Sequence, residues 1–258
     1  MQLLVDLGNS AVKYCTFAGG ELLNPQRELY KDRPDDELFA NLPDTTADIK
    51  SGTTIKSAWI SSVATAKSYD QIKQGLDAFE IPVIHQLQSQ IEQNGIRNAY
   101  SQASQLGVDR WMSLLAIKSI GLPSAIIVSC GTAITIDVLD EDGLHQGGFI
   151  SAGLGLQLQA LSSTALPQMK QANIDAISSG FKLASDTENA VISGTLYSIV
   201  SWIHRVVVES CNKNNNNIPR VITGGDAPLL LPYLSAQSQW RHEPNLVLRG
   251  VATIAGGS

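Results

Sequence analysis

Two stretches of this sequence decide its fold: LLVDLGNSAVKY, from Leu3 to Tyr14, and IIVSCGTAITID, from Ile126 to Asp137. In each, an apolar run ends in a small or acidic residue, a glycine and polar residues follow, and apolar residues then resume. This order predicts a strand, a tight turn and a second strand, with backbone N–H groups at the turn that can bind a phosphate. Because the phrase occurs twice, it indicates a duplicated domain with a nucleotide held between the two halves.

Composition excludes several classes of protein. The 258 residues are 43% hydrophobic, which is sufficient for a sizeable core. A net charge of -6 argues against a nucleic acid or an anionic membrane surface as the main partner. The three cysteines are odd in number and widely spaced, which is typical of a reducing compartment. An expected strand opens the chain in place of a signal segment, and the most apolar stretch contains polar residues, so we expect a cytoplasmic protein without a membrane segment.

The pattern along the chain predicts an α/β fold made of two similar halves, each a mixed sheet flanked by helices. In the first half we expect a hairpin at 2–17, strands at 57–63 and 81–84, helices at 68–79 and 104–120, and a loop at 86–102. In the second half we expect a hairpin at 124–139, strands at 145–150, 218–223 and 246–248, helices at 153–163 and 187–211, a helix after residue 226, and a short C-terminal helix. The domains are placed at 1–120 and 121–258.

The first glycine turn has residues suited to a nucleotide phosphate. Gly8 allows a tight turn, Asn9 and Ser10 can donate hydrogen bonds, and Lys13 can neutralise charge. Asp6 ends a strand, where a carboxylate could hold hydrated Mg²⁺ beside phosphates. The alternative for this motif alone is an ordinary hairpin.

Two further glycine motifs follow in the second half. Gly131-Thr132 forms the second expected phosphate turn, and Gly224-Gly225 comes between an apolar strand and a helix. Taken singly, each is an ordinary turn. Together the three motifs resemble the acetate and sugar kinase, Hsp70 and actin superfamily, which implies two ribonuclease H-like domains. The sequence lacks G-x-x-x-x-G-K-[ST] and G-x-G-x-x-G, which disfavours a P-loop or a dinucleotide fold.

Gly107-Val108-Asp109-Arg110 lies at the start of an expected helix. The helix dipole and the guanidinium would both favour an ionised Asp109, which could accept a proton from a substrate hydroxyl. The alternative is a helix-start carboxylate with a surface ion pair.

A fifth motif, Gly147-Gly148-Phe149-Ile150, follows the second turn. The five ordered motifs together closely resemble type III pantothenate kinase, over nearly the whole chain from Asp6 to about Gly250. This resemblance implies transfer of the ATP γ-phosphoryl group to pantothenate, which gives 4'-phosphopantothenate in the first step of coenzyme A synthesis. It also implies a homodimer. A non-catalytic regulator that senses a nucleotide or pantothenate remains the main alternative, and a sugar kinase ranks below it.

The resemblance assigns roles to individual residues. Asp109 matches the general base of the family, and Tyr100, Thr187 and the segment Gly107, Val108, Asp109 and Arg110 match its pantothenate-contacting residues. The ATP-binding residues implied are Asp6, Leu7, Gly8, Asn9, Ser10, Ala11, Val12, Lys13, Gly131, Thr132, Gly224 and Gly225. The alternatives are a core-packed loop aromatic for Tyr100 and a helix N-cap for Thr187.

Ser129 departs from the family pattern. The family usually has an aspartate at this position, associated with a monovalent cation, K⁺ or NH₄⁺. Because serine offers a neutral oxygen, we expect the cation requirement to be weakened here or met differently.

Overall fold

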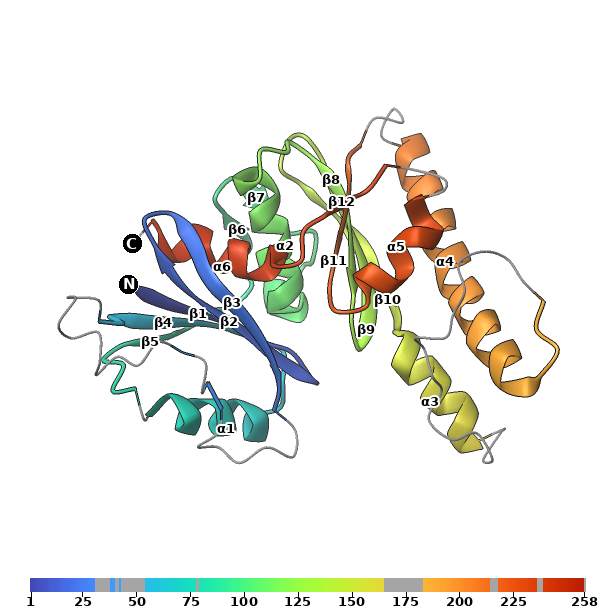
Figure 1. Ribbon diagram of the computed structural model, residues 1–258. Helices are drawn as coiled ribbons and strands as arrows, with labels where there is room; N and C mark the ends of the chain where they lie inside the picture. Colours follow the sequence, from blue (N-terminus) through green and yellow to red (C-terminus); the bar gives the residue numbers. More distant parts are fainter. Residues whose placement is uncertain are drawn as a thin grey trace. The chain divides into compact units, whose positions relative to one another are not determined.

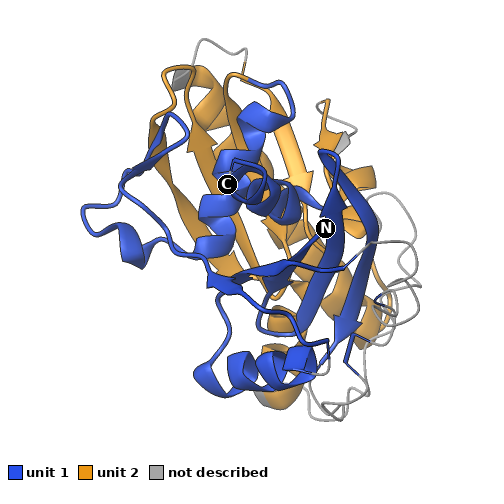
Figure 2. Cartoon of the chain, turned by 90° about the vertical axis from the view of Figure 1, so that its left-hand side faces the viewer, with its two compact units in different colours: residues 1–122, 245–258 blue, residues 123–244 orange. Residues whose placement is uncertain are grey.

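The computed structural model describes residues 1–30, 38–39, 42, 54–77, 79–164, 183–213, 218–235 and 239–257. The chain divides into two compact units, one of Met1–Leu122 with Asn245–Ser258 and one of Pro123–Pro244 (Figure 2). The boundary after Leu122 lies close to the expected one. Residues 245–258, which we expected in the second domain, belong instead to the first unit.

Unit 1 is built on a five-stranded mixed sheet (Figure 1). Its strands are β1 (Gln2–Leu7), β2 (Ala11–Ala18), β3 (Glu21–Leu29), β4 (Ser57–Ser62) and β5 (Ile84–Gln86), in the order β3-β2-β1-β4-β5. β1 pairs antiparallel with β2 and parallel with β4. Alternate residues of these strands point to one face and form a core with α1 (Ala66–Asp77), which includes Leu3, Val5, Leu7, Ala58, Ile60, Ile72 and Leu76.

Two further helices of unit 1, α2 (Val108–Ser119) and α6 (Leu246–Ala255), pack against each other and against the sheet. Their backbones come so close that a Cβ atom added to Gly250 would lie 1.9 Å from the carbonyl oxygen of Met112. This packing is the physical reason why the C-terminal segment joins the first unit. The expected strand at 246–248 is wrong: Leu246 and Leu248 are buried residues of α6, and a short apolar run does not distinguish a strand from a buried helix.

The segment expected to be a loop, 86–102, contains a small hairpin. Its strands are β6 (Glu92–Gln93) and β7 (Ile96–Arg97), and a 3-10 helix (Ala103–Gln105) follows. α2 therefore begins at Val108, later than the expected helix start at residue 104.

Unit 2 repeats the topology of unit 1. Its sheet consists of β8 (Ala125–Cys130), β9 (Ala133–Leu139), β10 (His145–Ala152), β11 (Arg220–Thr223) and β12 (Arg241–His242), in the order β10-β9-β8-β11-β12. β8 is antiparallel to β9 and parallel to β11, as β1 is to β2 and β4. The equal strand order confirms the two mixed sheets expected from the repeated phrase. The helices of this unit are α3 (Leu154–Thr164), α4 (Thr187–Lys213) and α5 (Ala227–Ser235).

α4 is the one described helix that is long and apolar enough, by length and composition, to cross a membrane. Its residues Ile192, Leu196, Ile199 and Ile203 belong to the hydrophobic core of unit 2, together with Val128 of β8. This packing accounts for the apolar residues on that face of α4.

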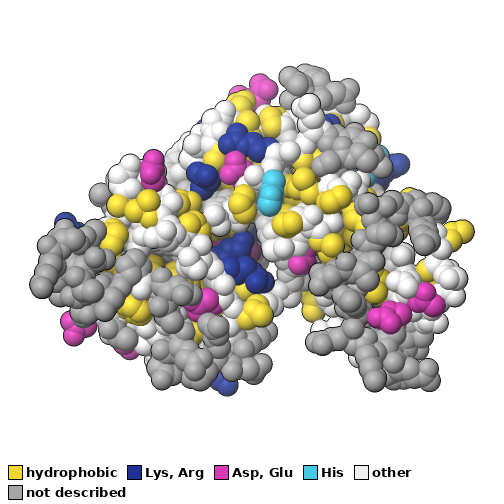
Figure 3. Space-filling model, viewed as in Figure 1, with side chains coloured by type: hydrophobic (Ala, Val, Ile, Leu, Met, Phe, Trp, Pro, Cys, Tyr) yellow, Lys and Arg dark blue, Asp and Glu magenta, His cyan; other side chains and the backbone are white. Residues whose placement is uncertain are grey.

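The described surface shows basic and acidic side chains in small separate groups on the face seen in Figure 3. All three cysteines, Cys15, Cys130 and Cys211, are buried and free.

Candidate active site

The first phosphate turn is a tight connection between β1 and β2. The amide of Gly8 donates a hydrogen bond to the carbonyl of Ala11 at 3.0 Å. Behind the turn, the hydroxyl of the buried Tyr30 donates to the carbonyl of Gly8 at 2.9 Å. Asn9 is exposed and Ser10 is partly exposed. The turn is therefore held from one side, and its polar tip is accessible to a ligand.

Asp6, Lys13 and Ser61 occupy one row across three strands. Asp6 of β1 is the register partner of Lys13 on β2 and of Ser61 on β4. Register partners on neighbouring strands carry their side chains on the same face of a sheet. The two motif residues Asp6 and Lys13 therefore lie side by side on one face of the sheet, and the pairing of β1 with β4 places Ser61 beside Asp6.

The carboxyl of Asp6 lies in an unusual electrostatic environment. Loss of hydration in the protein interior raises its pKa to about 7; attraction to Lys13 lowers it and repulsion from Asp109 raises it further. Burial also lowers the pKa of Lys13. The end of β1 and the start of α2 lie near each other within unit 1, because the amide of Val63 donates to the carbonyl of Leu7 at 3.1 Å and a Cβ atom at Gly107 would lie 3.7 Å from Cγ1 of Val63.

Ser61 is a polar neighbour of Asp6 that the sequence motifs missed. It is fully buried, and its hydroxyl has no hydrogen-bond partner among the described residues. The signal available in the sequence was its place at the end of the expected strand 57–63, but only strand pairing shows that it adjoins Asp6.

Asp109 lies in the first turn of α2, as expected. Gly107 is the N-cap, with φ -54° and ψ 134°, and it provides no side-chain cap. The amide of Arg110 donates to Oδ1 of Asp109 at 2.8 Å. A Cβ atom at Gly107 would lie only 2.6 Å from that same Oδ1. The absence of a side chain at Gly107 therefore leaves the space in which the Asp109 carboxylate sits.

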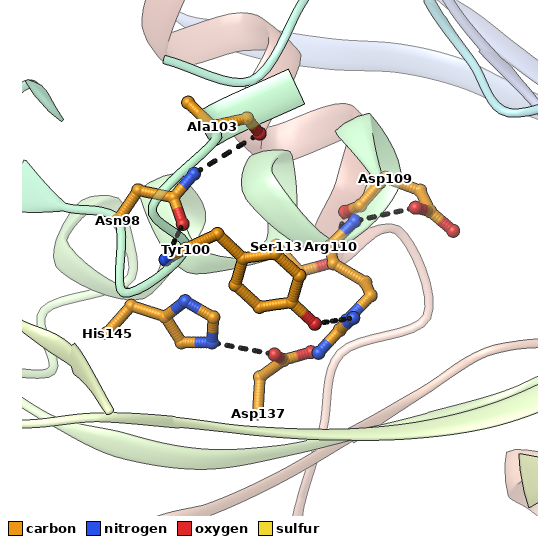
Figure 4. Close-up of polar contacts among 8 residues, drawn as sticks. All are labelled: Asn98, Tyr100, Ala103, Asp109, Arg110, Ser113, Asp137 and His145. Atoms are coloured by element: carbon orange, nitrogen blue, oxygen red, sulfur yellow. Dashed lines mark hydrogen bonds and ion pairs between the residues drawn. The ribbon is translucent and has the colours of Figure 1, made fainter. Parts of the chain in front are cut away.

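Tyr100 and Arg110 form a pair in front of α2 (Figure 4). A guanidinium nitrogen of Arg110 donates to the hydroxyl of Tyr100 at 3.1 Å, and the guanidinium carbon lies 5.7 Å from the centre of the Tyr100 ring. Arg110 is buried and Tyr100 is partly exposed. The two residues expected to contact substrate are thus brought into direct contact.

In unit 2 the second phosphate turn meets two other segments. The amide of Gly153, just before α3, donates to the carbonyl of Thr132 at 2.9 Å, and the amide of Asp226 donates to the carbonyl of Cys130 at 3.0 Å. Gly224 has φ +99° and approaches Cys130 so closely that a Cβ atom would lie 2.1 Å from its carbonyl oxygen. Thr132 and Gly225 remain exposed. The structure thus brings the second turn and the Gly-Gly loop to one edge of the sheet.

Ser129 is flanked by two hydroxyl side chains. Its register partners are Thr135 on β9 and Thr223 on β11, so three neutral oxygens lie in a row where the family pattern has a carboxylate. Among the described residues, no group of three or more His, Cys, Asp or Glu side chains could hold a metal ion.

Two further polar features of unit 2 stand apart from the glycine turns. The buried Asp137 and His145 are joined by a 2.8 Å contact between Oδ1 and Nε2 (Figure 4). Thr187 is exposed in the first turn of α4, and the helix is capped by Asp186, whose Oδ1 accepts from the amide of Asn189 at 2.9 Å. The cap is therefore not Thr187 itself.

Comparison with known proteins connects this geometry to one family. Residues 2–209 match a family model described as type III pantothenate kinase. The chain is 32% identical to the type III pantothenate kinase of Nitrosococcus oceani, over 99% of this chain and 94% of the relative. It is 34% identical to that of Halorhodospira halophila, over 97% and 96%.

A solved structure confirms the fold. The activator of the 2-hydroxyisocaproyl-CoA dehydratase from Clostridium difficile, with bound ADPNP, superposes with a TM-score of 0.55 at 11% identity, covering 98% of this chain and 93% of that one. At this identity the likeness shows the fold alone, that of the actin-like ATPases and sugar kinases.

Proposed function

The chain belongs to the type III pantothenate kinase family, and we propose that Asp109 is the general base of its reaction. The enzyme transfers a phosphoryl group from ATP to pantothenate in the synthesis of coenzyme A. Such transfer needs an acceptor hydroxyl that is oriented in line with the γ-phosphorus and loses its proton as it attacks. Asp109 suits this role because its carboxylate lies at a helix start and interacts with Asp6 beside the first phosphate turn.

The phosphates of ATP would be held by backbone amides and small side chains of the glycine turns. In unit 1 these are Gly8 to Lys13, and in unit 2 they are Gly131, Thr132, Gly224 and Gly225. Exposed polar groups at the tips and a fixed backbone beneath them support this assignment, because preorganised N–H donors stabilise the charge that develops during transfer. Lys13 would add a positive charge beside the phosphates.

Asp6 fits a hydrated Mg²⁺ ion. A divalent cation prefers carboxylate oxygen, and because burial raises the pKa of Asp6, a cation bound beside it would favour its ionised form. When bound, Mg²⁺ neutralises phosphate oxygens. The protein's own contribution is to hold Asp6 at the strand end, and Lys13 opposite it.

Pantothenate would be held by Tyr100, by the segment Gly107 to Arg110, and by Thr187. The contact between Tyr100 and Arg110 supports a shared substrate site beside Asp109. We further propose that the protein works as a homodimer in the cytoplasm. At Ser129, the row of neutral hydroxyls supports a weakened requirement for K⁺ or NH₄⁺.

The test is to incubate the purified protein with ATP, Mg²⁺ and pantothenate, and to identify the product by mass. Asp109→Asn should lower kcat by about 10²- to 10⁴-fold, the usual range for removal of a general base. Asp77→Asn, at an exposed position at the end of α1, is the matched control. Pantothenate and nucleotide binding without turnover by the wild-type protein would indicate a regulator. Full activity of Asp109→Asn would remove Asp109 from the role of base.

A further inference from the structure

Asn98 lies at the centre of the loop that carries Tyr100 (Figure 4). Its side-chain oxygen accepts a hydrogen bond from the backbone amide of Tyr100 at 2.9 Å. Its side-chain nitrogen donates to the carbonyls of Gln90 at 3.2 Å and Ala103 at 3.5 Å. One partly buried amide thus joins three points of the chain, which lie eight residues before it, two residues after it and five residues after it.

Only an amide side chain of this length supplies both kinds of partner. An acceptor must face the Tyr100 N–H, and two donors must face carbonyl oxygens. An aspartate keeps the acceptor but loses both donors, and an alanine loses everything. Position 98 therefore requires a side chain with both an acceptor and donors, as well as one of the size of asparagine.

The bonds of Asn98 act on Tyr100 and not merely on the loop. Other contacts already attach the loop to α2 and to the residues just before it. Ser89 Oγ donates to the carbonyl of Leu106 at 2.8 Å, and Lys118 Nζ of α2 donates to the carbonyl of Gly95 at 2.9 Å. Asn98 adds the contact that sets the backbone of Tyr100, whose hydroxyl and ring then meet the guanidinium of Arg110. A shift of the Tyr100 backbone would therefore also displace the Tyr100 ring and hydroxyl from the guanidinium of Arg110.

We propose that Asn98 is a positioning residue for pantothenate, which acts by holding Tyr100 in the orientation that pairs with Arg110. The proposal rests on the proposed function, in which Tyr100 and Arg110 contact pantothenate. It assigns no chemical step to Asn98. Its expected effect is on substrate binding, since the phosphate turns and Asp109 are held by other contacts.

The experiment measures steady-state kinetics of the full-length enzyme with Asn98→Ala and Asn98→Asp. Both should raise KM for pantothenate about tenfold, the effect of losing roughly one good interaction, while KM for ATP stays at the wild-type value. Gln102→Ala is the matched control, because Gln102 lies in the same loop, is exposed, and its side-chain oxygen accepts a hydrogen bond from the side chain of Gln105 and not from Tyr100. Equal rises in both KM values would show a general loss of structure and overturn the proposal.

A double-mutant cycle with Tyr100→Ala separates this proposal from the one on which it rests. If Asn98 acts through Tyr100, Asn98→Ala should add less than twofold to KM for pantothenate once Tyr100 is already alanine. Independent, multiplicative effects would overturn the positioning role. An unchanged KM for pantothenate in Tyr100→Ala alone would instead refute the assignment of Tyr100 to the substrate site. A raised KM in Tyr100→Ala with wild-type values in both Asn98 variants would refute only the inference on Asn98.

Discussion

Gly107→Ala should slow catalysis without damaging the fold. The added Cβ would lie 2.6 Å from Oδ1 of Asp109, whereas ordinary contacts of a Cβ begin at 3.4 Å. The carboxylate oxygen must therefore move by about 0.8 Å, or the side chain must rotate away. The other neighbour, Cγ1 of Val63, lies at 3.7 Å and needs no change.

The expected size of the effect follows from that displacement. A misplacement of about 1 Å in a reacting group can cost roughly 10²-fold in rate, so kcat should fall by about 10- to 100-fold. Stability should change little, because φ -54° and ψ 134° are accessible to alanine and the atom that must give way ends a flexible side chain. An alanine there even restricts the unfolded chain, worth about 0.4–1 kcal/mol in favour of folding.

The assay couples ADP release to a spectrophotometric readout at saturating ATP and pantothenate, with thermal unfolding measured in parallel. Gly155→Ala, on α3, is the matched control, since its Cβ would have no described atom within 4 Å apart from the adjoining residues and backbone of its own helix. A wild-type kcat in a folded Gly107→Ala enzyme would refute the argument that this glycine makes room for a working carboxylate. A large drop in melting temperature would refute the view that only the Asp109 side chain gives way.

Three further predictions concern the strand ends of the two units. Asp6→Asn should raise the free energy of unfolding of the metal-free protein by about 2–4 kcal/mol at pH 8, after allowance for residual solvent at the group. Burial raises the pKa of Asp6 from the ordinary 3.8 to about 7. Ionisation of Asp6 therefore lowers the free energy of unfolding of the wild type as pH rises from about 3.8 to about 7. The gain should vanish near pH 4; urea unfolding with an equal effect at both pH values would exclude charge as the cause. Ser61→Ala should leave the free energy of unfolding unchanged or raise it by about 1 kcal/mol, because it removes a buried hydroxyl that has no hydrogen-bond partner among the described residues. Urea denaturation that shows a loss above about 1 kcal/mol would contradict this reading. For Ser129, KCl and NH₄Cl titrations at constant ionic strength should show little activation of the wild type, whereas Ser129→Asp should acquire saturable activation; strong saturable activation of the wild type would contradict a weakened site.

Local patterns in the sequence determined much of this protein. Two glycine turns between apolar runs predicted both hairpins, because alternation and turn chemistry act over a few residues. The same local logic placed Asp109 at a helix start, and the order of the motifs identified the family to which the chain belongs.

Tertiary structure decided the features that join distant residues. Residues Leu246 to Leu248 form part of a helix in unit 1 because α6 packs on α2, which no local pattern records. Ser61 adjoins Asp6 only through the parallel pairing of β4 with β1, and the pKa of Asp6 is raised only when folding removes water and brings Asp109 near. Likewise, a side chain at Gly107 would collide with the Asp109 carboxylate only because folding places Oδ1 of Asp109 where the Cβ atom would lie. Propensity and spacing act between neighbours in sequence, whereas packing, strand register and loss of hydration arise only once the chain has folded.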